Sequence, residues 1–163
     1  MKYYPIAPGN SWEYRLKDGT VYSNKVLSEE GSLVTMQNST LPEPARLKIE
    51  GGSMFLELMG TDNFQLWLKD EMNAGESWDA AFTANGLSSV LHITVKDTGI
   101  SKEVEGKLYE DVVMLEAESK INMNGNLIST QYFTQYFYAA GTGLILTTSS
   151  AGDYHGLVAC TLL

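Results

Sequence analysis

Cysteine, histidine and basic residues are scarce in this chain. The 163 residues include one cysteine, Cys160, so an intramolecular disulfide and a cysteine zinc cage are both excluded. Eleven basic residues face twenty acidic ones, and the net charge of −9 disfavours binding to phosphate backbones and anionic headgroups. We therefore expect an acidic, soluble protein without a nucleic-acid partner, a metal or a cofactor.

Long apolar runs are also missing. No stretch approaches the length of a transmembrane helix, so no transmembrane segment is predicted. The start, Met1 to Pro5, has no apolar core of the kind that a signal peptide needs. The sequence as it stands predicts a cytoplasmic protein, and an exported or lipid-anchored one if a signal peptide has been removed.

What the sequence does contain is a series of turn signals that are typical of β-hairpins. Two-residue turns are predicted at Gly51-Gly52, Asn85-Gly86 and Asn124-Gly125, and Asp18-Gly19 is a fourth signal. Pairing across Gly51-Gly52 places apolar residues opposite each other on one face, whereas Arg46 meets Glu57 on the other face. This alternation is typical of an antiparallel sheet with one buried face.

The second hairpin has an equally clear register. Pairing across Asn85-Gly86 places Trp78 opposite Ile93 and Ala80 opposite Leu91, with almost every pair on that face apolar. No segment shows a convincing helical period, and the four prolines lie outside the predicted strands. We therefore predict one all-β domain over residues 1–163. It is a curved antiparallel meander of about ten strands, forming an open barrel or a two-layer sandwich.

Several motifs resemble those of a loose group of bacterial β-rich domains of unknown function, many of them exported or lipid-anchored. The motifs are Tyr3–Ile6 and Gly9–Tyr14 at the start, Ala74–Trp78 in the middle and Tyr138–Ile145 near the end, and the segment Val104–Val113 is similar to the central hairpin of that group. The resemblance implies one curved antiparallel sheet, with a short helix or a loop covering one face. It carries over no catalytic residues and no substrate.

No recognised catalytic or metal-binding spacing is found. His92 alternates with apolar neighbours and is predicted to face outward, and Cys160 is predicted to be a buried structural thiol rather than the partner of His155. The run Asn122–Asn126 departs from a calcium loop, because its glycine stands at the fourth position, and it is interpreted as a turn.

One strand is aromatic on both faces. Alternation places Tyr132, Tyr136 and Tyr138 on one face and Phe133 and Phe137 on the other. Such a strand is either covered on both sides or lines a cavity on one. We take the three tyrosines as the candidate ligand-binding residues, in a concave apolar pocket where their hydroxyls are the polar groups. A packed core is the alternative.

The leading hypothesis for function is a non-enzymatic module that binds a small apolar ligand or a protein partner. The first alternative is a small hydrolase or isomerase with carboxylates inside a barrel, such as Asp111 with Glu110, and a cavity carboxylate close to a histidine would favour it. The second is a structural component of a cell-envelope or surface assembly, which a large exposed apolar patch would favour. The sequence leaves the ligand and the oligomeric state open.

Overall fold

The computed structural model describes residues 1–59 and 61–163, and these form one sheet of twelve antiparallel strands. The described residues contain no helix, and therefore no helix that could cross a membrane. The strands are β1 (Ser11–Leu16), β2 (Val21–Glu30), β3 (Leu33–Asn38), β4 (Ala45–Glu50), β5 (Ser53–Glu57), β6 (Phe64–Lys69), β7 (Ser77–Ala84), β8 (Leu87–Val104), β9 (Lys107–Met123), β10 (Asn126–Ala139), β11 (Gly143–Ser149) and β12 (Tyr154–Thr161).

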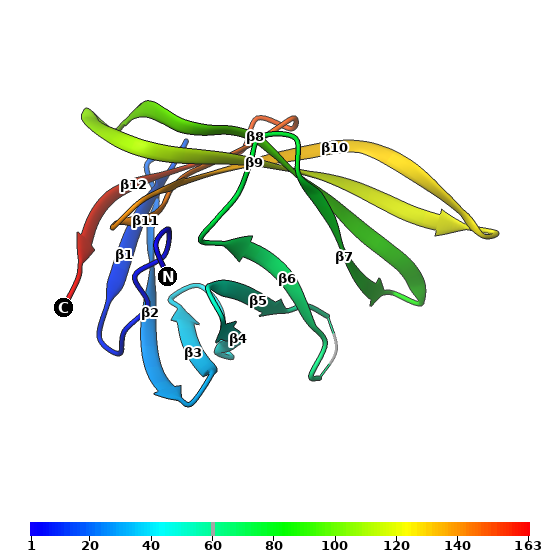
Figure 1. Cartoon of the computed structure of the whole chain (residues 1–163), viewed down its shortest axis with the longest axis horizontal. Helices are drawn as coiled ribbons and strands as arrows, with labels where there is room; N and C mark the ends of the chain where they lie inside the picture. The colour runs from blue at the N-terminus through cyan, green and yellow to red at the C-terminus, as the bar shows by residue number, and fades with distance from the viewer. Residues whose placement is uncertain (60) are drawn as a thin grey trace.

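The sheet curls until its two edges nearly meet (Figure 1). Its spatial order is β6-β5-β4-β3-β2-β1-β12-β11-β10-β9-β8-β7, so the first and last strands of the chain pair in the middle. The edge strands β6 and β7 follow one another in sequence and close the structure without a backbone ladder between them. The predicted curved antiparallel meander is therefore confirmed as one nearly closed, barrel-like sheet, with twelve strands where about ten were expected.

The hairpin registers agree with those expected from the turns. Leu47 pairs with Leu56 across Gly51-Gly52, and Trp78 pairs with Ile93 across Asn85-Gly86. Asn85 and Gly86 have φ of 53° and 77°, as the I′ turn of a tight hairpin requires. A two-residue turn fixes the register of the strands that it joins, and the pairings could therefore be predicted from the sequence.

The concave face carries most of the core. Trp12 and Tyr14 of β1 are fully buried there, and their polar atoms are satisfied across the sheet. The Trp12 indole donates to the carbonyl oxygen of Thr142 at 2.7 Å, and the Tyr14 hydroxyl donates to the carbonyl oxygen of Leu144 at 2.7 Å. Tyr4 meets the Trp12 ring edge-on with 4.8 Å between centroids. Residues from the first and last of the motifs noted above thus meet in one aromatic junction.

The convex face is covered in part by the chain itself. The β8–β9 hairpin is long, and its distal end bends over β10, β12 and β1, so that Glu105 lies 3.8 Å from Arg15 and Lys102 lies over the Phe137 ring (Figure 1). Val104, Tyr109 and Phe137 are buried beneath or within this cover. The cover was expected to be a short helix or a loop, and it is instead a strand hairpin. Gly99 and Asp111 have positive φ, and they lie where the β8–β9 ladder is irregular and the hairpin bends.

Candidate functional site

The three candidate tyrosines all face the interior of the barrel, at increasing depth along β10. Tyr132 stands at the rim with 40% of its surface exposed, Tyr136 is half-buried, and Tyr138 is 3% exposed. A bulge between Ser129 and Phe133, with Gln131 at φ 61°, precedes the paired stretch in which Tyr136 faces Leu115 and Tyr138 faces Val113. The predicted alternation thus places these rings on one inner wall. Their role in binding stays a prediction.

Two cavities open on this inner wall. The first, the rim cavity, has a volume of about 510 Å³ and is lined by Tyr132 and Tyr136 together with side chains from β2, β8, β9, β11 and β12. The second, the apolar cavity, has a volume of about 380 Å³, and Tyr136 and Tyr138 line it with residues of β2 to β6. Both volumes are of the size that small-molecule sites have. Tyr136 and Leu144 line both cavities, and we refer to the two cavities together as the hollow.

The apolar cavity is walled by large hydrophobic and aromatic side chains. Its lining includes Tyr4, Met36, Leu47, Met54 and Trp67. The Trp67 indole donates to the Tyr138 hydroxyl at 3.0 Å, and its ring meets Tyr136 edge-on with 5.2 Å between centroids. Burial raises the pKa of Tyr136 to about 12 and raises that of Tyr138 further. Both phenols are therefore neutral hydrogen-bonding groups at physiological pH.

The rim cavity has a polar wall on its β12 side. The Tyr22 hydroxyl lies 2.6 Å from Nδ1 of His155, and the Tyr132 hydroxyl donates to Asp153 at 2.7 Å. Ser149 also donates to Asp153. The hydrogen bond from Ser149, followed by that from Tyr132, lowers the pKa of the Asp153 carboxyl. The cavity therefore offers both hydrogen-bond donors and acceptors on one side, and rings on the other.

Sequence reasoning missed this polar wall because its members come from β2, β10, β11 and β12 and share no spacing. In the β1–β12 ladder Leu157 pairs with Tyr14 and Cys160 pairs with Trp12, with a bulge in β12 between the two pairs. The prediction of a buried Cys160 was wrong, since the thiol lies exposed near the end of the strand. His155 is bonded to Tyr22 and forms no dyad with the thiol.

Other sequence candidates lie away from the hollow. Asp111 and Glu110 are exposed, and Asp111 contacts Lys2 and Tyr3 where β9 bends, so they supply no carboxylates to the interior. His92 faces outward as predicted and contacts Asp79 at 2.7 Å. The Asn122–Asn126 run is a turn, in which the Gly125 amide donates to the Asn122 side chain. Within the described residues, no group of three or more histidine, cysteine or acidic side chains is placed to hold a metal ion.

The fold and its interior define the class of this protein as a twelve-stranded, nearly closed β-sheet around a tyrosine-lined hollow. Solved structures share the fold. A Bacteroides fragilis protein, described as a "putative exported protein with YmcC-like fold", aligns over 98% of this chain and 99% of its own with a TM-score of 0.59 and 12% identity. A "putative lipoprotein" from Parabacteroides distasonis aligns over 98% of both chains with a TM-score of 0.50 and 11% identity.

The hypothetical lipoprotein YmcC from Escherichia coli aligns over 98% of this chain and 88% of its own, with a TM-score of 0.46 and 10% identity. No protein-family model matches the sequence, and no curated protein is similar to it. The resemblance noted from the sequence thus reaches proteins described as exported or as lipoproteins. At these identities the similarity shows the fold alone.

Proposed function

We propose that this protein binds a small, largely apolar ligand in the hollow of its sheet, and that Tyr132, Tyr136 and Tyr138 form one wall of the site. The observation that carries the proposal is the position of Tyr136. Its half-buried ring lines both cavities, so it is accessible from the interior space rather than enclosed on all sides by core.

The two cavities differ in chemistry, and this difference defines the ligand class. The apolar cavity would take a hydrocarbon or aromatic body against Trp67 and Tyr138. The rim cavity would take a hydrogen-bonding end beside Tyr22, His155 and Asp153. A pocket with a mostly apolar lining and a few convergent polar groups is typical of sites that orient an amphipathic small molecule.

A titration with the uncharged dye N-phenylnaphthylamine tests the proposal, because a neutral dye is not repelled by a protein of net charge −9. The wild type should bind with enhanced dye fluorescence, and Tyr136→Ala should weaken binding by at least about tenfold, since it removes the ring shared by both cavities. Tyr109→Ala is the matched control, because this buried tyrosine belongs to the convex cover and lines neither cavity. Equal loss in both variants, or no binding by the folded wild type, would refute the proposal.

A second candidate function rests on the acid and the imidazole of the rim cavity. His155 and Asp153 line the same space, as a small hydrolase or isomerase would require. Asp153 would act as a fixed anion, because its hydrogen bonds lower its pKa. Turnover of small nitrophenyl esters that is lost in His155→Gln would support this function, and wild-type rates equal to those of buffer alone would count against it for that substrate class.

We also infer that the chain belongs to the exported or lipid-anchored group that its motifs resemble. The support is the shared fold over nearly the whole length of two such structures and the meeting of Tyr4, Trp12 and Gly143 at one junction. Expression of the full natural gene product, followed by fractionation of the cells, tests this inference. Recovery only in the cytoplasmic fraction would contradict it.

A further inference from the structure

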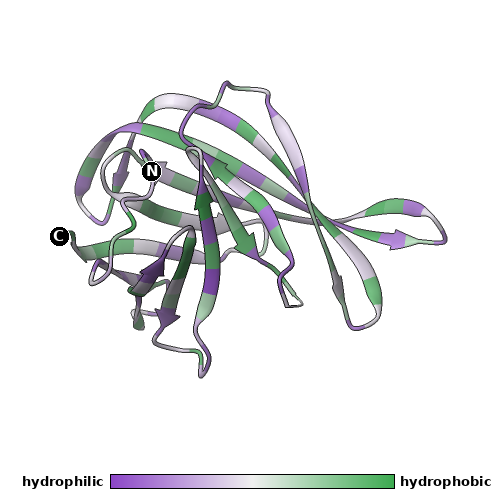
Figure 2. Ribbon diagram, turned by 60° about the horizontal axis from the view of Figure 1, so that its bottom comes forward, coloured by the Kyte–Doolittle hydropathy of each residue, from purple (hydrophilic) through white to green (hydrophobic). Residues whose placement is uncertain are grey.

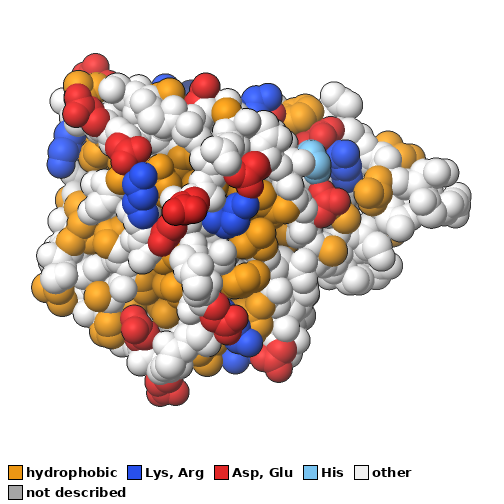
Figure 3. Space-filling model, in the orientation of Figure 1, with side chains coloured by type: hydrophobic (Ala, Val, Ile, Leu, Met, Phe, Trp, Pro, Cys, Tyr) orange, Lys and Arg blue, Asp and Glu red, His pale blue; other side chains and the backbone are white. Residues whose placement is uncertain are grey.

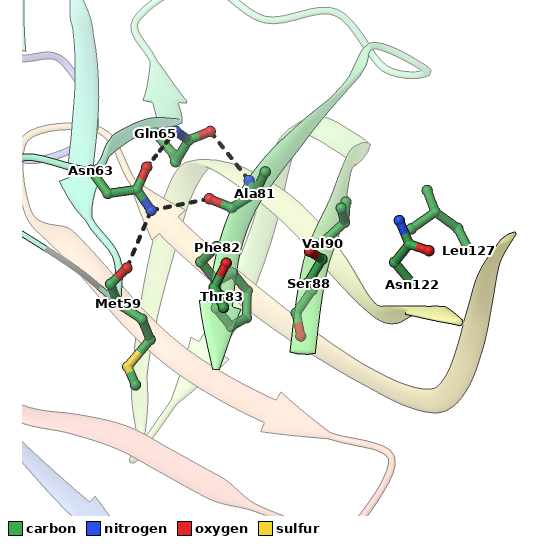
Figure 4. Close-up of a pocket in the computed structure, with 11 residues that line it drawn as sticks. Met59, Asn63, Gln65, Ala81, Phe82, Thr83, Ser88, Val90, Asn122 and Leu127 are labelled. Atoms are coloured by element: carbon green, nitrogen blue, oxygen red, sulfur yellow. Dashed lines mark hydrogen bonds between the residues drawn. The ribbon is translucent and has the colours of Figure 1, made fainter. Parts of the chain in front are cut away.

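Two hairpins project beyond the barrel on the same side of the molecule (Figures 1 and 2). One is the β7–β8 hairpin, which turns at Asn85-Gly86, and the other is the β9–β10 hairpin, which turns at Asn124-Gly125. A groove of about 390 Å³ lies beside the first hairpin, lined by Phe82, by Leu127 of the second hairpin and by Asn63 and Gln65 of the body (Figure 4). We call the two projecting ends the hairpin tips.

The hairpin tips expose several large apolar side chains to solvent. Leu87 is 49% exposed on the first hairpin, and Met123, Leu127 and Ile128 are 53%, 49% and 49% exposed on the second. Single exposed apolar side chains are ordinary, whereas a cluster at one protruding end marks a contact surface.

The same tips carry no charged side chain. No Asp, Glu, Lys or Arg occurs between residues 80 and 95 or between residues 121 and 152, although the chain holds thirty-one such residues, eleven basic and twenty acidic. In Figure 3 the protruding end is white and orange without charged side chains, and the nearest charged ones lie where it joins the body. The polar residues between the apolar ones are Asn, Ser and Thr, which can hydrogen-bond to headgroups without a net charge.

We propose that the hairpin tips insert into the interface of an uncharged, zwitterionic lipid surface. The tips are narrow and convex, and a lipid surface can enclose such an end from every side. A stable protein partner or a second copy would need about 20 to 30 contact residues on each side, which two turns do not provide. An anionic lipid surface is disfavoured, because no basic side chain accompanies the exposed apolar ones and the whole protein has a charge of −9.

Flotation with phosphatidylcholine vesicles tests the proposal directly. The wild type should float with the vesicles, and Leu127→Asp combined with Ile128→Asp should lower the bound fraction at least about tenfold, because a carboxylate is costly to bring into the lipid interface. Leu108→Asp is the matched control and should bind like the wild type, since Leu108 is 61% exposed but lies at the other end of β9. Replacing part of the phosphatidylcholine by phosphatidylglycerol should not strengthen binding.

Several outcomes would overturn the proposal. These are no flotation of the wild type, equal loss in Leu108→Asp, or binding that appears only with phosphatidylglycerol and falls with salt, which would indicate electrostatic adsorption. Tip-dependent dimerisation in analytical ultracentrifugation without flotation would assign the surface to a second copy. If the double variant does not fold, Leu127→Trp is measured instead, and brominated phosphatidylcholine should quench its added fluorescence, whereas absence of quenching counts against insertion.

Discussion

At the scale of single residues, glycine is required for different reasons at the aromatic junction and in the hairpin turns. Gly143 has φ of 113°, and a Cβ there would stand 3.0 Å from the Trp12 indole nitrogen and 3.1 Å from the Tyr4 ring. Gly86 also has a positive φ, but a Cβ there would meet nothing within 4 Å. Gly143 is therefore constrained by its backbone conformation and by packing, and Gly86 by its backbone conformation alone.

This difference predicts the order of two substitutions. Gly86→Val should lower the free energy of unfolding by about 1 to 3 kcal/mol, because a β-branched residue is strained at positive φ. Gly143→Ala should cost more than Gly86→Ala, because it adds a clash with two buried rings to the same strain. Urea denaturation of the three variants measures both effects. An unchanged midpoint for Gly86→Val would contradict the turn geometry, and equal midpoints for the two alanine variants would contradict the close approach.

Residue by residue, the sequence predicts side chains that alternate within one strand better than those that depend on another strand. The inner face of Tyr136 and Tyr138 follows from alternation, because the β10 bulge precedes the paired stretch that holds them. Tyr132 lies within the bulge and still lines the rim cavity. The exposure of Cys160 does not follow from alternation. The residue pairs with the buried Trp12, but it lies next to the end of β12, where its thiol is exposed. The contact between His155 and Tyr22 joins β12 to β2, and no pattern within either strand predicts it.

At the scale of elements, the seam between β6 and β7 is closed by side chains rather than by a ladder. Asn63 donates to the carbonyl oxygen of Ala81 at 3.1 Å, and the Ala81 amide donates to the Gln65 side chain at 3.2 Å (Figure 4). Gln65 also donates to Asn63 at 2.8 Å, which holds the two amides together. The pair thus takes the place of a neighbouring strand at this one residue of the β7 edge.

Removing this pair should open the seam. Asn63→Ala combined with Gln65→Ala should cost about 1 to 3 kcal/mol, at about 0.5 to 1.5 kcal/mol for each of the two hydrogen bonds to Ala81, because the bond between the two amides loses both partners together. Amide hydrogen exchange at Ala81 should speed up, because its donor loses its partner. Gln37→Ala is the control, since this side chain bonds to loop carbonyls at the other side of the sheet. Unchanged protection of Ala81 in the double variant would show that the seam is held by something else.

The pairing register of hairpins with tight turns could be predicted from the sequence, whereas the bend of the long β8–β9 hairpin could not. The registers across Gly51-Gly52 and Asn85-Gly86 are set by two residues and an alternating pattern. The β8–β9 hairpin bends at irregular points of its ladder and covers the convex face, and this depends on contacts such as Arg15 with Glu105 that span most of the chain. The resemblance implied a cover formed by a short helix or a loop, and the structure forms it from a strand hairpin instead.

At the scale of the whole molecule, buried tyrosines couple the fold to alkaline pH. Burial raises the pKa of Tyr136 to about 12 and raises the pKa of Tyr4, Tyr14 and Tyr138 as well. In the unfolded chain these phenols ionise near pH 10, at about their ordinary pKa. Each raised pKa therefore contributes stability that is fully present below about pH 10 and is lost as the pH rises through the folded-state pKa.

The protein should accordingly unfold between about pH 10 and pH 12. Loss of β-sheet circular dichroism should coincide with the part of the tyrosinate absorbance that comes from the buried phenols, because these can ionise only when the sheet opens. Ionisation of all tyrosines in a protein that stays folded would contradict the buried positions of these rings.

The central claim is that the sheet encloses a hollow and not a packed core at Tyr136, and thermal melts with and without N-phenylnaphthylamine test it most directly. A fully packed ring costs about 3 to 5 kcal/mol when it is truncated to alanine. We predict a smaller loss for Tyr136→Ala, and a dye-dependent rise in melting temperature for the wild type that is absent in the variant, because a ligand stabilises only the state that binds it. A loss in the full range together with a wild-type melt that does not respond to the dye would contradict the account.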